Sequence, residues 1–154
     1  MGGLLGKGVN KMVKMNKSIF INAPVEKVFA YVEDPSNLPE VWPSMVEVKN
    51  IKSDADGKKN YDWTYKMAGI NIKGYSETLE YEANKRIVVN NPKGIESKFT
   101  WDYIPEGDGT RINVEVEYNI PLPVLGKLAE AIIVKQNEKE ADTLLANVKL
   151  KMES

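Results

Sequence analysis

Six short segments between residues 45 and 120 constrain the fold more than any other feature of the sequence. They cover residues 45–53, 59–67, 70–82, 87–91, 96–104 and 111–120, and most of them alternate polar and apolar side chains. Turn residues separate them, beginning with Asp56-Gly57 and ending with Gly107-Asp108-Gly109. Because parallel pairing needs crossovers of roughly a dozen residues or more, these short connections predict an antiparallel meander. The alternation slips by one residue at Gly74, which indicates a β-bulge.

One further strand and three helical segments are expected around the meander. Residues 14–22 alternate as a strand, and Pro24 then starts a short amphipathic helix that ends near Asp34-Pro35. A second helical turn is expected at residues 36–40. After Pro123 the chain contains no proline and one glycine up to residue 152, which predicts a long C-terminal helix. We expect a flexible arm at residues 1–13 and one domain at residues 14–152.

The composition excludes several kinds of chemistry. The chain has no histidine and no cysteine, so imidazole acid–base catalysis, thiol nucleophiles and Cys/His zinc sites are ruled out. We expect neither a metal site nor a cofactor. The 21 Lys and Arg residues are balanced by 22 Asp and Glu residues, which argues against nucleic-acid binding.

The sequence also bears on location. No apolar run approaches the roughly 18 residues of a membrane span, and we expect a cytoplasmic protein. Lys7, Lys11, Lys14 and Lys17 precede the first acidic residue. They are interpreted as a solvated basic arm, and weak peripheral contact with an anionic surface is the alternative.

Large aromatic side chains gather on one face of the expected sheet. In the segment 59–67, Tyr61, Trp63 and Tyr65 lie on one face and polar residues on the other. The same face receives Phe99, Trp101, Tyr103, Val116 and Tyr118 from later segments. These rings either form an ordinary core or line a cavity, in which the polar ends of Tyr and Trp would bind a guest.

The C-terminal helix offers polar groups to the same space. Its apolar stripe contains Ile133, Leu144 and Val148, and Gln136, Asn137 and Glu140 fall within it. Either these three side chains line a cavity under the helix, or the stripe rotates and they border solvent.

Three segments resemble a known family. Residues 19–43, IFINAPVEKVFAYVEDPSNLPEVWP, resemble the opening of the START-like, or helix-grip, superfamily in its polyketide cyclase/dehydrase and lipid transport branch. Residues 107–111, GDGTR, are similar to its usual turn before the last strand. Residues 121–126, PLPVLG, leading to LLANVK at 144–149, resemble its closing helix. The resemblance implies an α+β helix-grip fold, in which a curved seven-stranded antiparallel sheet wraps a long C-terminal helix.

The resemblance further implies a small hydrophobic or aromatic ligand, such as a lipid, an isoprenoid or quinone, or a polyketide-like molecule, in a cavity of several hundred Å³. The expected ligand-binding residues are Trp42, Tyr61, Trp63, Tyr65, Phe99, Trp101, Val116, Tyr118, Ile133, Gln136, Asn137 and Glu140. We expect a carrier or binding protein with no catalytic residue. The alternative is a cyclase or dehydratase in which Glu140 and Tyr61 or Tyr65 move protons.

Overall fold

The computed structural model describes residues 12–121 and 126–154 of the chain. The strands are β1 (Val13–Ile21), β2 (Met45–Ser53), β3 (Lys59–Met67), β4 (Ile70–Glu82), β5 (Arg86–Lys93), β6 (Ser97–Glu106) and β7 (Gly109–Tyr118). The helical segments are α2 (Val25–Val32), η1 (Pro35–Asn37), α3 (Leu38–Val41) and α4 (Lys127–Glu153).

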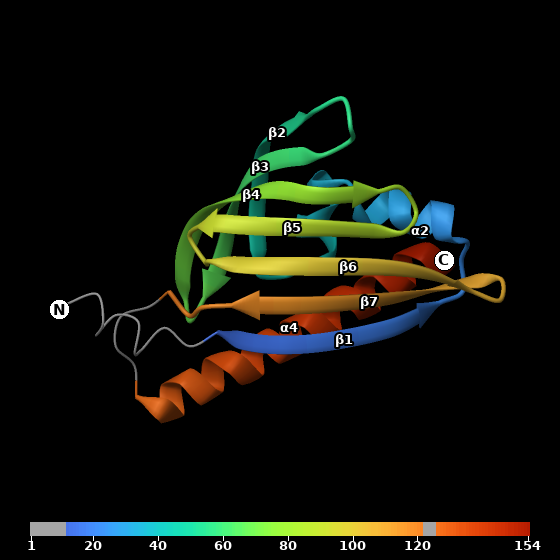
Figure 1. Cartoon of the computed structure of the whole chain (residues 1–154). Helices are drawn as coiled ribbons and strands as arrows, with labels where there is room; N and C mark the ends of the chain where they lie inside the picture. The colour runs from blue at the N-terminus through green and yellow to red at the C-terminus, as the bar shows by residue number, and fades with distance from the viewer. Residues whose placement is uncertain (1–11, 122–125) are drawn as a thin grey trace.

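All seven strands belong to one antiparallel sheet with the order β1-β7-β6-β5-β4-β3-β2 (Figure 1). Strands β2 to β7 therefore form the expected meander. Strand β1 adds to its far edge, where Val13 pairs with Tyr118 and Ile21 with Thr110. This arrangement confirms the predicted α+β helix-grip fold.

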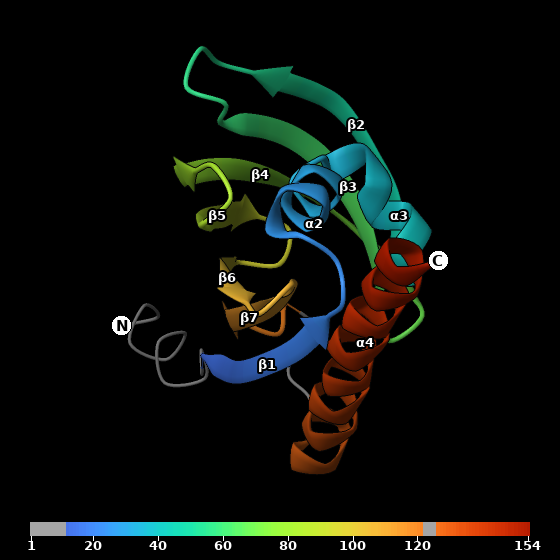
Figure 2. The ribbon, with the colours of Figure 1, turned by 90° about the vertical axis from the view of Figure 1, so that its right-hand side faces the viewer.

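The sheet curves into an arc, and α4 runs along its open side (Figure 2). Helix α4 packs against β1, α2 and α3, so a space is left between it and the middle of the sheet. Lys17 of β1 fixes the helix at one edge through Glu138, at 2.8 Å, and Asp142, at 3.1 Å. On the other side of α4, Leu144 and Val148 are buried in the core.

Several predicted boundaries differ from the structure. Val13 belongs to β1 rather than to an N-terminal arm, because its backbone pairs with Tyr118. The rest of that predicted arm, residues 1–11, lies outside the described residues. Strand β7 begins earlier than expected, at Gly109, and ends at Tyr118. The described part of the C-terminal helix begins at Lys127 after the N-cap Gly126, and residues 122–125 are not described.

Gly74 has a different role from the predicted bulge. It pairs in regular register with Trp63 of β3. The irregularities lie on the other side of β4, between Tyr75 and Glu77 and between Thr78 and Glu80 in the pairing with β5. A Cβ atom on Gly74 would lie 2.2 Å from the Trp63 ring and 2.5 Å from the carbonyl oxygen of Lys93. The glycine therefore makes room for the indole of Trp63 beneath β4.

Candidate functional site

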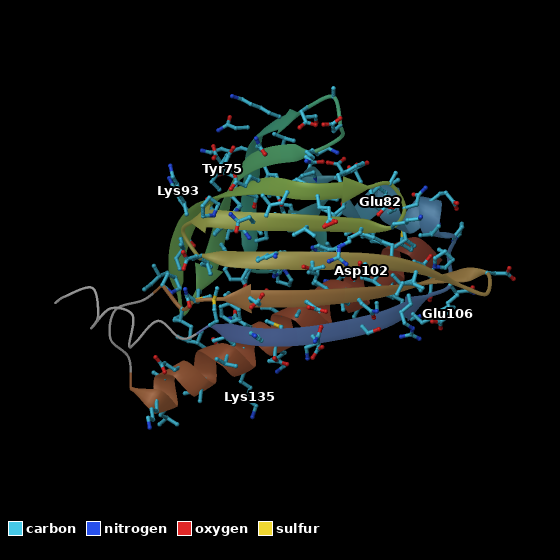
Figure 3. All side chains as sticks on the ribbon, viewed as in Figure 1. Tyr75, Glu82, Lys93, Asp102, Glu106 and Lys135 are labelled. Carbon is cyan, nitrogen blue, oxygen red and sulfur yellow. The ribbon has the colours of Figure 1, made fainter. Side chains whose placement is uncertain are left out.

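The aromatic face of the sheet and α4 line a partly open cavity of about 120 Å³. Its walls come from all seven strands, to which β1 and β2 contribute Met15 and Met45, and from the helical segments on the open side of the arc. The opposite, convex face is polar: Figure 3 shows Asp102 of β6 and Glu82 of β4 there, and Arg86 forms an ion pair with Asp102 at 2.9 Å. Alternation along the strands thus separates a wet face from a ring-lined one, as expected.

Nine of the twelve predicted ligand-binding residues line this cavity. They are Trp42, Tyr61, Trp63, Tyr65, Phe99, Trp101, Val116, Tyr118 and Asn137. The structure therefore brings together side chains from the end of α3, three strands and α4. Whether they bind a ligand remains a prediction.

The other three predicted residues lie elsewhere. Ile133 is buried in the core but does not line the cavity, and Gln136 is exposed. Glu140 is half-buried outside the cavity wall, where its carboxylate accepts a hydrogen bond from the Ser44 backbone N–H at 2.9 Å. Helix α4 is rotated so that Asn137, Ala141 and Leu144 face the cavity instead.

The cavity is smaller than the expected several hundred Å³ because the large rings occupy much of the space. Phe99 and Tyr65 each pack edge-to-face on Trp42, with centroids 5.7 Å and 5.5 Å apart. A volume of about 120 Å³ is close to that of an engineered apolar cavity, of roughly 150 Å³, that binds benzene. In this conformation the space suits one ring, and a larger guest requires the walls to move apart.

One buried polar cluster surrounds Asn91 of β5. The Trp63 Nε1–H donates to Asn91 Oδ1 at 3.2 Å, and the Ser76 hydroxyl donates to the same oxygen. Asn91 Nδ2 donates to Ser97 Oγ at 2.9 Å, and that hydroxyl donates to the Ile95 carbonyl oxygen. All these polar groups satisfy one another, so the cluster stabilises the wall.

The Asn91 cluster was not predicted from the sequence. Asn91 follows Ile87 and Val89 at every second position, and this alternation was the available signal that its side chain points inward. The same reasoning applies to Ser76, which is buried on β4.

A second polar cluster joins α4 to the sheet through Asn137. The Tyr65 hydroxyl donates to Asn137 Oδ1 at 3.4 Å, and Asn137 Nδ2 donates to the Tyr118 hydroxyl at 3.1 Å. Trp42 is part of the same end of the cavity because its ring contacts Tyr65. Its indole Nε1–H is shielded from solvent and meets no described acceptor at good hydrogen-bond geometry, but it lies close enough to the Tyr65 hydroxyl to lower the pKa of that group.

Burial raises the pKa of the cavity tyrosines. The pKa of Tyr65 rises to about 12, first because of burial and then because of the negative charge of Glu140. Burial also raises the pKa of Tyr61 and of Tyr118. These hydroxyls therefore stay protonated at neutral pH. The Tyr65 hydroxyl donates to Asn137 Oδ1, whereas the Tyr118 hydroxyl accepts from Asn137 Nδ2.

An ion pair lies in the wall near α2. Glu33 and Lys59 line the cavity and contact each other, with exposed side-chain fractions of 17% and 21%. The Lys59 ammonium also lies 5.9 Å from the centre of the Tyr81 ring. No periodic pattern predicted this pair, because Glu33 follows a helix and Lys59 begins a strand.

Neither Arg86 nor Arg111 lines the cavity. Arg86 pairs with Glu80 and Asp102, and Arg111 pairs with Glu106 at 2.8 Å. Among residues 12–121 and 126–154, no three acidic side chains gather in a way that could hold a metal ion. None of the helices in these residues combines the length and the apolar character that a membrane span requires.

Known structures share this architecture. A Thermus thermophilus protein is 20% identical with a TM-score of 0.80, over 91% of this chain and 97% of that chain. A START superfamily protein from Mycobacterium smegmatis is 17% identical with a TM-score of 0.76, over 91% and 97% of the two chains. The Zhui aromatase/cyclase from Streptomyces sp. R1128 is 12% identical with a TM-score of 0.73, over 90% and 94%. At these identities the likeness shows the fold alone.

A match between the sequence and a family model identifies the family. No curated protein matches the chain. The family model described as polyketide cyclase/dehydrase and lipid transport matches residues 12–153, nearly the whole chain. The chain therefore belongs to the polyketide cyclase/dehydrase and lipid transport family.

Proposed function

We propose that this protein binds a small hydrophobic or aromatic molecule in the cavity between the sheet and α4, as a carrier or binding protein. The observation that carries the proposal is a cavity walled by three tryptophans, several tyrosines and Phe99. Ring faces and a few fixed polar groups are the usual lining of small-molecule sites. The proposed guest is lipid-like, isoprenoid, quinone-like or polyketide-like, and the proposed location is the cytoplasm.

Two observations favour binding over proton-transfer catalysis. The Glu140 carboxylate lies outside the cavity wall and is engaged by the Ser44 N–H. A general base must lie within hydrogen-bond reach of the proton that it takes, and Glu140 does not meet that requirement for a guest in the cavity. Tyr61 and Tyr65, with their raised pKa values, are protonated at neutral pH and do not replace it as bases.

The basic N-terminal segment adds little to this proposal. Lys14 lies 3.8 Å from Glu117, and Lys17 is paired with Glu138 and Asp142. These two lysines therefore have acidic partners within the fold, which leaves fewer free cations for contact with an anionic surface.

Thermal unfolding with a panel of apolar compounds tests the proposal. A ligand that binds the folded state alone, at about 100 times its Kd, stabilises a protein by roughly 2.7 kcal/mol. For a domain of this size that corresponds to a rise in Tm of about 5–10 °C. Single-ring compounds, quinones, flavonoids, fatty acids and sterols form the panel. If no compound raises Tm or binds by calorimetry, the proposed function is wrong.

A pair of variants locates the binding. Ala141 lines the cavity from α4, whereas Ala146 is exposed on the same helix. Ala141→Phe places a ring in the cavity and should lower the affinity for a ligand at least about 10-fold. Ala146→Phe makes the same change away from the cavity and should leave the affinity unchanged. Equal effects of the two changes would place the bound compound elsewhere.

A further inference from the structure

The outward face of α4 is exposed along most of the helix. Helix α4 lies along the open edge of the molecule (Figure 2), and Lys135 points away from the sheet (Figure 3). Seven positions that follow one another at intervals of three or four residues are all exposed: Leu128, Ile132, Lys135, Lys139, Asp142, Ala146 and Leu150. At about 100° per residue they fall within an arc of about 80° and form a stripe about 33 Å long. We call these seven residues the outer stripe.

The outer stripe leaves large apolar side chains in water. Leu128 and Leu150 are 78% and 69% exposed, the two highest values among the large apolar side chains that the structure describes. Ile132 is 51% exposed. Single exposed apolar residues need no explanation, but three on one helix face indicate a surface that another molecule covers.

The apolar residues of the outer stripe match one another when a second copy of α4 runs antiparallel. A twofold axis at Lys139 places Leu128 opposite Leu150 of the second copy. The same axis places Ile132 opposite Ala146 of the second copy, so a large side chain meets a small one. In a twofold interface each of these contacts occurs twice, once at either end.

The charges of the outer stripe match in the same register. Lys135 lies opposite Asp142 of the second copy, between the two apolar pairs. Asp142 contacts Lys17 through Oδ1, yet its side chain is 63% exposed and is open to a second cation. Lys139, at the axis, has a stem long enough to carry its ammonium group to the solvent at the rim.

A lipid surface fits the outer stripe less well than a second copy does. Its two apolar ends are separated by Asp142, which the negative charge of an anionic membrane repels. A neutral membrane offers Lys135 and Lys139 no opposite charge. An antiparallel copy covers both apolar ends and brings an acidic group to the lysines.

We propose that the outer stripe of α4 is the interface of a symmetric, antiparallel dimer of this protein. The inference goes beyond the proposed function, because Asn137 and Ala141 line the cavity from the opposite face of α4. A strip of about 33 Å by 10 Å covers roughly 300 Å² on each copy, which is less than in stable complexes. We therefore expect a reversible dimer with a Kd of about 10–500 µM.

Sedimentation velocity of the full chain, from about 10 µM to 1 mM, measures the association. Ile132→Ser should weaken the dimer at least about 10-fold, because the change removes an apolar contact at both ends of the interface. Ile104→Ser is the matched control, since Ile104 is 42% exposed on β6, away from α4. It should leave the Kd unchanged. A monomer over the whole range, or equal effects of the two changes, would overturn the proposal.

Single cysteines test the register, because the natural chain contains none. When Ile132→Cys and Ala146→Cys proteins are mixed, a short bismaleimide should join one to the other. Lys139→Cys should cross-link to itself at the axis. Ile132→Cys alone should not, since its two copies lie about 21 Å apart in this register. Self-linking of Ile132→Cys without the mixed product would indicate parallel helices and contradict the proposal.

Vesicles separate the dimer from membrane binding. If the chain co-sediments with phosphatidylglycerol vesicles through Ile132 and stays monomeric in solution, the outer stripe binds lipid and the proposed dimer is wrong. Ligand binding in the cavity is measured at protein concentrations below the Kd of the dimer. Failure of the dimer therefore leaves the proposed function standing, and failure of ligand binding leaves the dimer standing.

Discussion

The carboxylate of Glu140 accepts a hydrogen bond from the backbone N–H of Ser44 at 2.9 Å. Helix α4 thereby holds the chain just after Trp42, together with Asn147, whose side chain donates to the carbonyl oxygen of Val41 at 2.9 Å. The part of the wall that carries Trp42 is therefore fixed by residues about 100 positions later in the sequence. This relationship gives Glu140 a structural role.

Replacing Glu140 should reduce the stability of the protein in the absence of any ligand. Glu140→Ala removes a charge-assisted hydrogen bond and should lower the free energy of unfolding by about 1.5–3 kcal/mol. Glu140→Gln keeps an acceptor oxygen and should cost about half as much. Urea unfolding measures both, and Lys139→Ala, at an exposed position on the same helix, is the control. Equal losses for Glu140→Ala and Lys139→Ala would contradict the anchoring role.

Gly74 should tolerate no side chain. A Cβ atom would lie 2.2 Å from the Trp63 ring and 2.5 Å from the Lys93 carbonyl oxygen, so either the indole or strand β5 must shift. We expect Gly74→Ala to lower the free energy of unfolding by about 2–3 kcal/mol, in the range of overpacked cores. Gly126→Ala, where no described residue lies within 4 Å, should cost less than about 1 kcal/mol. Chemical denaturation of the two variants measures the difference between their free energies of unfolding.

The meander was predictable because its signals are local. Alternation sets the face of each side chain, so Tyr61, Trp63 and Tyr65 could be assigned to the concave face from the sequence alone. The turns between the strands are too short for parallel crossovers, so the strands must pair antiparallel. The same alternation assigns Asn91 to the cavity face, because it follows Ile87 and Val89 at every second position of β5.

The rotation of α4 was less predictable. Its apolar residues do not form one clean stripe: Leu128, Ile132 and Leu150 are exposed. Neighbouring helical positions point about 100° apart, so a small error in the assumed axis exchanges one side chain for the next. Asn137 therefore lines the cavity, while the adjacent Gln136 is exposed.

Contacts between distant residues were beyond prediction. The Glu140–Ser44 hydrogen bond and the Glu33–Lys59 pair depend on how helices dock on the finished sheet. No repeat or spacing in the sequence connects such positions. The volume of the cavity, likewise, depends on ring orientations that alternation does not specify.

Alkaline pH should destabilise the protein through Tyr65. Its pKa in the folded state, about 12, lies above the ordinary value of 10.0, so the folded protein holds this proton more tightly than the unfolded chain does. The resulting stability is complete below pH 10 and is lost as the pH rises from 10 to about 12. Urea unfolding at several pH values in this window should show a shallower decline for Tyr65→Phe than for the unaltered protein. Parallel declines would show that Tyr65 ionises as it does in the unfolded chain.

Removing either member of the Glu33–Lys59 ion pair should lower the free energy of unfolding. Both side chains are largely buried in the cavity wall, at 17% and 21% exposed, so removing one charge leaves the other without its partner in a poorly solvated place. Because some solvent reaches both groups, we expect Glu33→Gln and Lys59→Met each to lower the free energy of unfolding by about 1–2 kcal/mol. The double variant should lose less than the sum of the two single changes, since it removes both charges at once.

A double-mutant cycle on these residues supplies the test. A coupling free energy of at least about 1 kcal/mol is expected between Glu33 and Lys59, and it should persist in moderate salt because the pair is mostly shielded. The exposed pair of Lys14 and Glu117, 3.8 Å apart, is the matched comparison and should show coupling near zero. If the two pairs couple equally, solvent screens Glu33 and Lys59 as it does surface charges, and the wall near α2 is open to water rather than closed by an ion pair.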